Sequence, residues 1–343
     1  MERSDRTHVN LALFALAIGG FAIGNVSSAL ASSYPLLMIA RFVSGLPHGA
    51  FLGVAALLAA SLVPLRRRTW AVSMVLAGLT TANVVGVPVT TWVGQRLGWQ
   101  YPYALVGVIA LVTLVATRRW VPPQPHEGQA SMRAELGALK RLQVWLALLI
   151  GTVGFGGMFA TYSYIAPTMT TLGGFPDGAI PVVLAIYGVG MTAGAMLAGR
   201  VAQRGVMRGI VLSLVAVAMV LGAFGFAVRQ PVTAVLVVFL LGLVPSILVP
   251  MLQTRLMDVA REGQSLAAAL NHSTLNIANA LGAWLGSLVL SAGYGYEWPS
   301  RIGVVLALAG LVVAGVSVLV DRRRGPVGGP RAQGDPERLS GAP

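Results

Sequence analysis

The sequence predicts an all-α polytopic membrane protein, built from two helical bundles with about ten visible transmembrane helices, four in the first and six in the second. Three observations predict this fold class. Of the 343 residues, 56% are hydrophobic and only 10% are charged, whereas soluble domains carry about 25% charged residues. Apolar runs long enough to cross a bilayer recur almost from end to end. Arginine gathers in alternate connections between these runs.

The expected spans are stretches of about 17 to 25 apolar residues. They cover residues 9–30, 36–62, 70–92, 103–117, 144–169, 180–202, 209–228, 232–256, 265–290 and 298–320, and the fourth is short. A secretory signal peptide is the alternative for the first stretch, because Arg3 and Arg6 precede it and it ends in Ala-Leu-Ala. The stretch is longer than the apolar core of a signal peptide, which favours a membrane span.

The connections between the spans alternate in basic charge. One set holds most of the arginines, and the other set holds only Arg96, Arg229 and Arg301. Because Lys and Arg in short loops stay on the cytoplasmic side, both termini and the long central connection are predicted to be cytoplasmic, in the cell membrane. The net charge of +13 is thus dispersed over loops. No nucleic-acid partner is expected, since that would need basic residues clustered on a soluble face.

Composition divides the chain into four parts. Residues 1–120 are expected to form an amino-terminal bundle, 121–143 a cytoplasmic linker, 144–320 a six-helix bundle and 321–343 a disordered cytoplasmic tail. The linker begins with Val-Pro-Pro-Gln-Pro and continues into a polar stretch, 131–141, that could form a surface helix. The tail is rich in Gly, Pro, Arg and Ser, a composition typical of disorder.

An internal repeat supports the two bundles. At a shift of about 196 residues, 82–86 (ANVVG) aligns with 278–282 (ANALG), and 106–108 aligns with 302–304. Agreement in shift among short matches indicates duplicated bundles of the parallel kind. Since the second copy has six spans and the first has four, we expect the first two spans of a six-plus-six ancestor to be absent.

Three segments resemble signatures of one family. Residues 37–50 contain Arg-x-x-x-Gly followed by Pro-His-Gly, 82–88 contain a glycine and a proline on one span, and 199–208 read GRVAQRGVMR. Together they resemble the major facilitator superfamily, specifically its drug and sugar efflux branch, over residues 1–320. The strict Gly-x-x-x-Gly-Pro form is not met, and Gln203 stands where the family's loop signature commonly has aspartate. The first-half copy of that loop survives at best as Asp5-Arg6.

The resemblance implies a major facilitator fold and a monomeric secondary active transporter. It implies proton-coupled efflux of a small drug-like or sugar-like solute by alternating access, with that solute, protons and the lipid bilayer as partners. A non-transporting, amino-terminally truncated fragment or scaffold is the rival interpretation. A membrane-embedded enzyme is a third, weakened by the lack of carboxylates and clustered histidines within the spans.

Polar side chains within the apolar spans are the candidates for substrate or coupling contacts, because such groups are costly in a bilayer unless they face a cavity or a partner. These candidates are Arg41, His48, Asn83, Tyr162, Ser246, Gln253, His272, Asn276 and Asn279. Arg41 is expected either to face a cavity or to extend toward the outer interface. For the other groups, interhelical hydrogen bonding or packing stays open beside substrate contact.

A second set of residues is expected to act in gating or helix packing. It comprises Gly45, Gly49, Gly86, Pro88, Gly199, Arg200, Arg204 and Arg208. Gly45 and Gly49 follow a small-x-x-x-small spacing that favours close helix contact. Gly86 and Pro88 allow a bend as well as close packing.

No acidic residue lies well within a predicted span, so a visible proton carrier would have to be His48 or His272. Neutral, hydrogen-bonded histidines are the alternative. The sequence has no cysteine, and it shows no phosphate-binding loop, metal-ligand cluster or paired catalytic carboxylates. No enzyme activity, metal or cofactor is expected.

Overall fold

The computed structural model describes residues 2–64, 68–121, 136–260 and 263–323, and within them every regular element is a helix. The first half contains α1 (Glu2–Ala29), α2 (Tyr34–Ser61), α3 (Arg68–Thr81), η2 (Ala82–Gly86), α4 (Val87–Leu97) and α5 (Gln100–Trp120). The second half contains α7 (Leu142–Leu149), η4 (Ile150–Gly154), α8 (Phe155–Tyr162), α9 (Ile165–Thr171), α10 (Ile180–Ala202), α11 (Val206–Ala227), α12 (Pro231–Ala260), α13 (Gln264–Ser291) and α14 (Trp298–Arg323). The all-helical membrane fold predicted from composition is confirmed.

Seven helical stretches of the described residues are long and apolar enough to cross a membrane. They are Gln100–Trp120, Leu142–Tyr162, Asp177–Ala202, Val206–Ala227, Pro231–Ala260, Ala269–Ser291 and Trp298–Arg323. The predicted number of ten spans is therefore approximate. The prediction that the fourth span is short was wrong, because α5 has 21 residues and includes the flanking Tyr and Arg residues at its ends.

Two of the spans predicted from the sequence, 70–92 and 144–169, contain a π-helical turn. In η2, which joins α3 to α4, the turn directly precedes Pro88, a residue with no N–H to donate to the helix ladder. The hydroxyl of Thr90 donates to the carbonyl oxygens of Gly86 at 2.8 Å and Val87 at 3.0 Å beside this proline. The second turn, η4, contains Gly151 and Gly154. Such turns bend a helix and often lie at functional sites.

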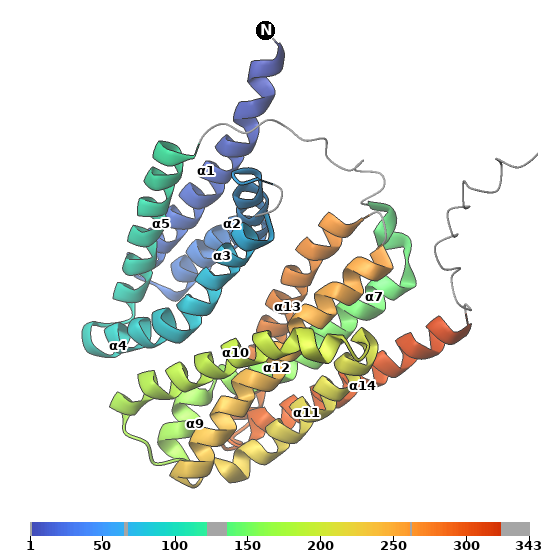
Figure 1. Cartoon of the computed structure of the whole chain (residues 1–343). Coiled ribbons are helices and arrows are strands. Elements are labelled where there is room, and N and C mark those ends of the chain that lie inside the picture. Colours follow the sequence, from blue (N-terminus) through green and yellow to red (C-terminus); the bar gives the residue numbers. More distant parts are fainter. Residues whose placement is uncertain (1, 65–67, 122–135, 261–262, 324–343) are drawn as a thin grey trace, which may run out of the picture.

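The helices pack in two groups that lie side by side (Figure 1). In the first group α1 packs against α2 and α5, and α2 packs against α3. In the second group α12 packs against α10 and α11, α14 packs against α11, and α8 contacts both α13 and α14. The largest fully buried side chains, among them Phe224, Leu241 and Met251, belong to the second group. The division at 121–143 stays a prediction, and its residues 122–135 are outside the described ones.

Glycines allow the closest helix contacts of the second group. A Cβ at Gly190 or Gly194 of α10 would overlap backbone oxygens of α12, and a Cβ at Gly242 of α12 would overlap the carbonyl oxygen of Tyr187. Small residues that let backbones approach in this way are typical of membrane helices. At Gly45, by contrast, a Cβ would meet no described atom within 4 Å, so the structure shows no helix contact at this predicted packing position.

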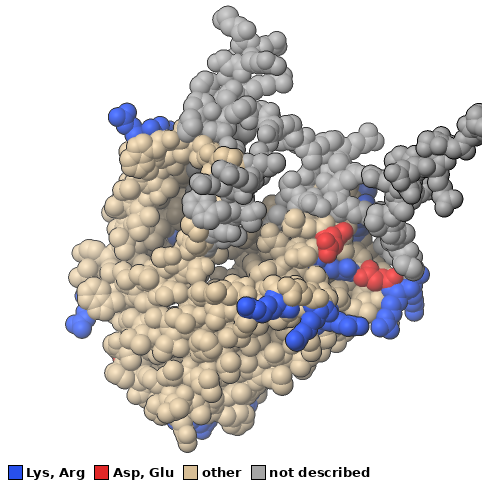
Figure 2. All heavy atoms as spheres, viewed as in Figure 1, with Lys and Arg blue, Asp and Glu red and all other residues tan. Residues whose placement is uncertain are grey.

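The outer surface is largely apolar. On the face shown in Figure 2, most of the area below the charged side chains at the centre and right is free of charged residues. Large apolar side chains such as Leu212, Met219 and Val312 are more than 60% exposed on the outside of α11 and α14. A surface of this kind is stable against lipid tails and not against water.

The predicted linker helix and tail are only partly covered by the described residues. Of 131–141, the described part has two α-helical residues followed by a short 3₁₀ turn, Ala138–Lys140. The last helix, α14, continues to Arg323, beyond the boundary predicted at residue 320. The rest of the tail is outside the described residues.

Candidate functional site

The two groups of helices meet along the bent third span. Both η2 and α4 pack against α10, and α2 contacts α13. A Cβ at Gly188 of α10 would lie only 2.6 Å from the carbonyl oxygen of Asn83, so glycine is needed for this approach. Val87 of α4 packs against the hydrophobic core of the second group. At the end of α4, the Gln95 side chain donates to the carbonyl oxygen of Asp177 at 3.0 Å.

An aromatic pair lies directly beside this contact. The rings of Tyr162 on α8 and Tyr187 on α10 are 4.6 Å apart at their centroids. The Tyr187 hydroxyl donates to the Met158 sulfur at 3.3 Å. Tyr187 directly precedes Gly188, which approaches Asn83, so the pair involves the same helix that makes the contact between the two groups. Aromatic and thioether groups with a few polar atoms suit an apolar or amphipathic ligand.

Tyr162 and Asn83 were predicted from the sequence, whereas Tyr187 and Gly188 were not. Tyr187 is 4% exposed, and its ring faces Tyr162. A tyrosine inside an otherwise apolar span, followed at once by glycines at 188 and 190, was the available signal. Asn83 itself donates its side-chain amide to the carbonyl oxygen of Leu79 at 2.9 Å.

Arg41 lies inside the first group of helices, between α1, α2 and α5. Its guanidinium donates to the side-chain oxygen of Asn25 at 3.1 Å and lies 5.1 Å from the ring centroid of Tyr103. Asn25 is 2% exposed. A cation–π contact and a hydrogen bond to a neutral acceptor partly replace the water that an arginine loses in a bilayer. Both partners were missed by the sequence analysis, although Asn25 is a polar residue within the first apolar run.

The Arg41 contact leads to a prediction about stability. Asn25→Leu should lower the free energy of unfolding by about 2 kcal/mol, because it leaves the guanidinium of Arg41 without its buried acceptor. Adding Arg41→Met to that variant should recover part of the loss, since the charge is then gone. Unfolding of the purified proteins in mixed micelles measures both values. If the losses of unfolding free energy from the two replacements simply add, Asn25 and Arg41 are not in contact.

The polar stripe of α13 points away from the core of the second group. On the opposite face of α13, Ala278 and Gly282 pack against α8, and a Cβ at Gly151 would lie 2.5 Å from a methyl group of Thr274. Asn276 and Asn279 are exposed, whereas His272 is half-buried. The structure therefore keeps the predicted stripe together on one face and shows no hydrogen bond from Asn276 or Asn279 to another described residue.

The remaining candidates are dispersed. Ser246 is buried and lies against Gly194 where α10 and α12 pack, and Gln253 is half-buried two turns further along α12. The loop residues Gly199, Arg200, Arg204 and Arg208 are exposed around the α10–α11 turn, where Gly205 has a φ of +109°. Gly86 and Pro88 are half-buried at the η2–α4 bend. His48 and Gly49 belong to α2, but their side chains are outside the described residues.

A hydrogen-bonded network at the basic end of the second group was not predicted. Gln143 of α7 donates to the carbonyl oxygen of Ser317 at 2.9 Å and accepts from the Ser317 hydroxyl at 2.7 Å. It also accepts from Arg255 of α12 at 3.3 Å, and Arg255 forms an ion pair with Asp321 of α14. The network thus joins α7, α12 and α14.

Within this network, burial decides which replacement has the larger effect. Gln143→Leu should cost about 2–3 kcal/mol of unfolding free energy, because Gln143 is 5% exposed and its loss strands the donors of Ser317 and Arg255. Asp321→Asn should cost less than about 1 kcal/mol, because the Asp321 side chain is 44% exposed. Unfolding in mixed micelles compares the two. An equal loss for both variants, or a larger loss for Asp321→Asn, would show that the Arg255–Asp321 ion pair contributes more stability than the hydrogen bonds of Gln143.

The chain forms two groups of apolar helices that meet at a bent span beside a polar and aromatic site. This arrangement is that of a multi-pass membrane transporter and not of an enzyme. The family comparison agrees: the model described as "Major Facilitator Superfamily" matches residues 4–264 and, a second time, residues 148–341. The chain belongs to the major facilitator superfamily.

Curated relatives cover most of the chain. The inner membrane transport protein YdhP of Escherichia coli strain K12 is 34% identical over 317 residues, which are 92% of this chain and 80% of that protein. The putative transporter AraJ of the same strain is 30% identical, covering 90% of this chain and 78% of AraJ. A chloramphenicol resistance protein of Streptomyces lividans is 30% identical, covering 84% of this chain and 75% of that protein.

Among solved structures, the fucose:proton symporter FucP of E. coli has the same fold. It superposes with a TM-score of 0.57 at 14% sequence identity, over 90% of this chain and 84% of FucP. At this identity the likeness concerns the fold alone. The major facilitator fold expected from the sequence motifs is thereby confirmed.

Proposed function

We propose that this chain exports a small drug-like or sugar-like solute by alternating access, with the proton gradient as its energy source. The observation that carries the proposal is the aromatic and thioether site of Tyr162, Tyr187 and Met158 beside the Asn83–Gly188 contact between the two groups of helices. Rocking the groups about this contact would expose the site to either side of the membrane in turn.

The names of the relatives support the class of substrate. One is a chloramphenicol resistance protein, and two others are probable sugar efflux transporters of Mannheimia succiniciproducens and Helicobacter pylori. Chloramphenicol and sugars are both small polar molecules, and the site combines apolar rings with hydroxyl and amide groups that can hydrogen-bond to them.

For proton coupling we propose His272 as the carrier within the described residues. It is half-buried on the polar stripe of α13, and imidazole titrates in the physiological range. Asn276 and Asn279 follow on the same face and would line the same space. We further propose that the chain is a monomer of the cell membrane with both termini in the cytoplasm, as the distribution of arginine predicts.

Transport into everted membrane vesicles tests the proposal. Vesicles carrying this chain should accumulate labelled chloramphenicol or a labelled sugar when the pH gradient is imposed, and Tyr162→Ala should reduce that uptake while leaving the amount of protein unchanged. Vesicles carrying the S. lividans chloramphenicol resistance protein serve as the reference for chloramphenicol. Uptake that is independent of the pH gradient would contradict the proposed proton coupling. No uptake of any compound would favour the non-transporting alternative.

A further inference from the structure

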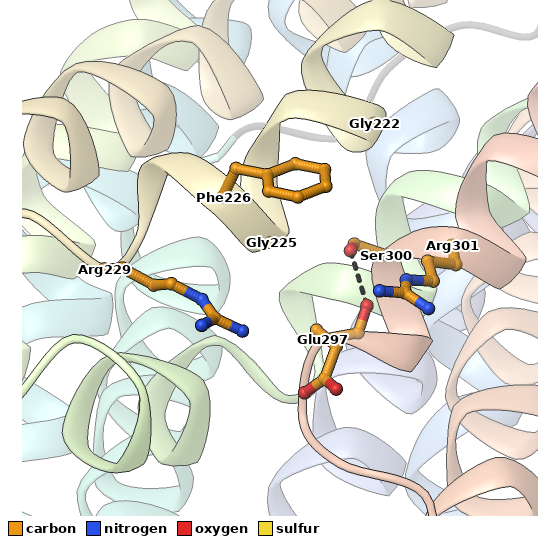
Figure 3. A pocket seen from close by; sticks show the side chains of 7 residues that line it. All are labelled: Gly222, Gly225, Phe226, Arg229, Glu297, Ser300 and Arg301. Carbon is orange, nitrogen blue, oxygen red and sulfur yellow. Dashed lines mark hydrogen bonds between the residues drawn. The ribbon is translucent and has the colours of Figure 1, made fainter.

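A recess lies at the far end of the second group from the Arg255 network, between the end of α11 and the start of α14 (Figure 3). Its lining residues are Gly222, Gly225, Phe226, Arg229, Glu297, Ser300 and Arg301, and its volume is about 30 Å³. A cavity needs about 10–15 Å³ of such space to hold one water molecule. The recess is therefore a notch that could accept one small group of a larger ligand.

The charged groups around this recess are not paired with one another. Arg229 extends toward Glu297 in Figure 3, yet no ion pair within 4 Å joins Glu297 to an arginine among the described residues. The guanidinium of Arg301 lies over the Trp298 ring, 4.7 Å from its centroid. The Ser300 hydroxyl donates to the backbone oxygen of Glu297 at 2.8 Å. Two cations and one anion thus flank a single notch.

The surroundings of the recess place it where lipid headgroups lie. Phe226 is 76% exposed, and Met219 and Leu212, each 64% exposed, continue the same lipid-facing side of α11. The rings of Trp298 and Tyr294 lie 4.6 Å apart at their centroids, tilted by 51°, beside the recess. Trp and Tyr gather at the membrane–water interface, where their rings are apolar and their polar atoms are hydrated. A ligand of the recess would therefore arrive from the bilayer with an acyl chain along α11.

We propose that the recess binds the headgroup of an aminophospholipid such as phosphatidylethanolamine. Arg229 and Arg301 would hold the phosphodiester, and Glu297 would accept hydrogen bonds from the primary ammonium. A choline headgroup has no N–H donor to offer Glu297. A glycerol headgroup carries no cation to pair with Glu297. The inference depends on membrane insertion and not on the substrate of transport.

Lipid retention on the purified protein tests this inference, measured by native mass spectrometry with phosphatidylethanolamine, phosphatidylcholine or phosphatidylglycerol added. The unchanged chain should retain phosphatidylethanolamine most strongly. Arg229→Gln with Arg301→Gln should weaken that retention about fivefold or more, as expected for exposed charged contacts. Glu297→Gln should abolish the preference over phosphatidylglycerol. Arg96→Gln, another arginine of the sparsely charged loops, is the control and should change nothing.

Three results would overturn the inference. Equal retention of the three lipids by the unchanged chain would remove the headgroup selectivity. Retention unaffected by the double arginine replacement would place the lipid elsewhere. Displacement of the bound lipid by soluble glycerophosphoethanolamine would show that the recess takes a free headgroup and that the acyl contact with α11 contributes nothing, whereas resistance to this displacement supports a lipid ligand.

Discussion

Gly242→Val is expected to abolish the recovery of folded protein. A side chain at residue 242 would overlap the carbonyl oxygen of Tyr187, and helices α10 and α12 would have to separate. The contact involves backbone atoms, which cannot move without moving the helix. Overpacking of a tight core typically costs about 1–3 kcal/mol. Here it would also disturb Gly190 and Gly194, which face α12 on the same side of α10.

Gly315→Val on α14 is the matched control for this prediction. Gly315 is exposed, and a Cβ there would meet nothing within 4 Å, so the same residue change adds only the helix-propensity difference. The measurement is the amount of monodisperse protein after detergent extraction and gel filtration. We expect near-normal recovery for Gly315→Val and little or none for Gly242→Val. Similar recovery of both variants would mean that α10 and α12 do not pack as the structure has them.

The sequence predicted where helices lie better than how they pack. The run expected over 180–202 coincides with α10, Ile180–Ala202, because hydropathy and length define a span locally. The π-helical turn of η4 was not foreseen, since Gly151 and Gly154 are equally compatible with a straight helix in tight contact. Gly45 matched a packing pattern yet lies exposed, while Gly242, which was not predicted, lies in close contact with α10. Spacing alone does not reveal which face of a helix meets a partner.

The candidate site, too, could be predicted residue by residue but not as an arrangement in space. Tyr162 and Asn83 were selected because each is a polar group within an apolar run, which is a property of a single segment. In the structure each of them contacts α10: Tyr162 lies against Tyr187, and Asn83 lies against Gly188, about 25 and 105 residues away along the chain. No local pattern encodes either pairing. Ser246 was selected by the same criterion, and the structure places it in the α10–α12 packing contact.

Gly188→Leu is expected to abolish transport while leaving both groups of helices folded. The replacement puts a side chain where Asn83 and Val84 of the η2 turn now lie, since even a Cβ would be 2.6 Å from the Asn83 carbonyl oxygen. The face of α10 that packs against α12 is not altered, so each group keeps its own core. What is lost is the close approach between the groups, and with it the conformation described by the structure.

Cross-linking distinguishes loss of this contact from loss of folding. The chain contains no cysteine, so Gln95→Cys and Asp177→Cys introduce a single thiol pair at the end of the α4–α10 contact, where the two residues are hydrogen-bonded. A short thiol cross-linker should join them in the otherwise unchanged chain and should fail after Gly188→Leu. Gly78→Leu on α3 is the control, because a Cβ there meets nothing within 4 Å. Retained cross-linking with lost transport would place the effect of Gly188 in the adjoining Tyr162–Tyr187 site instead of the contact between the groups.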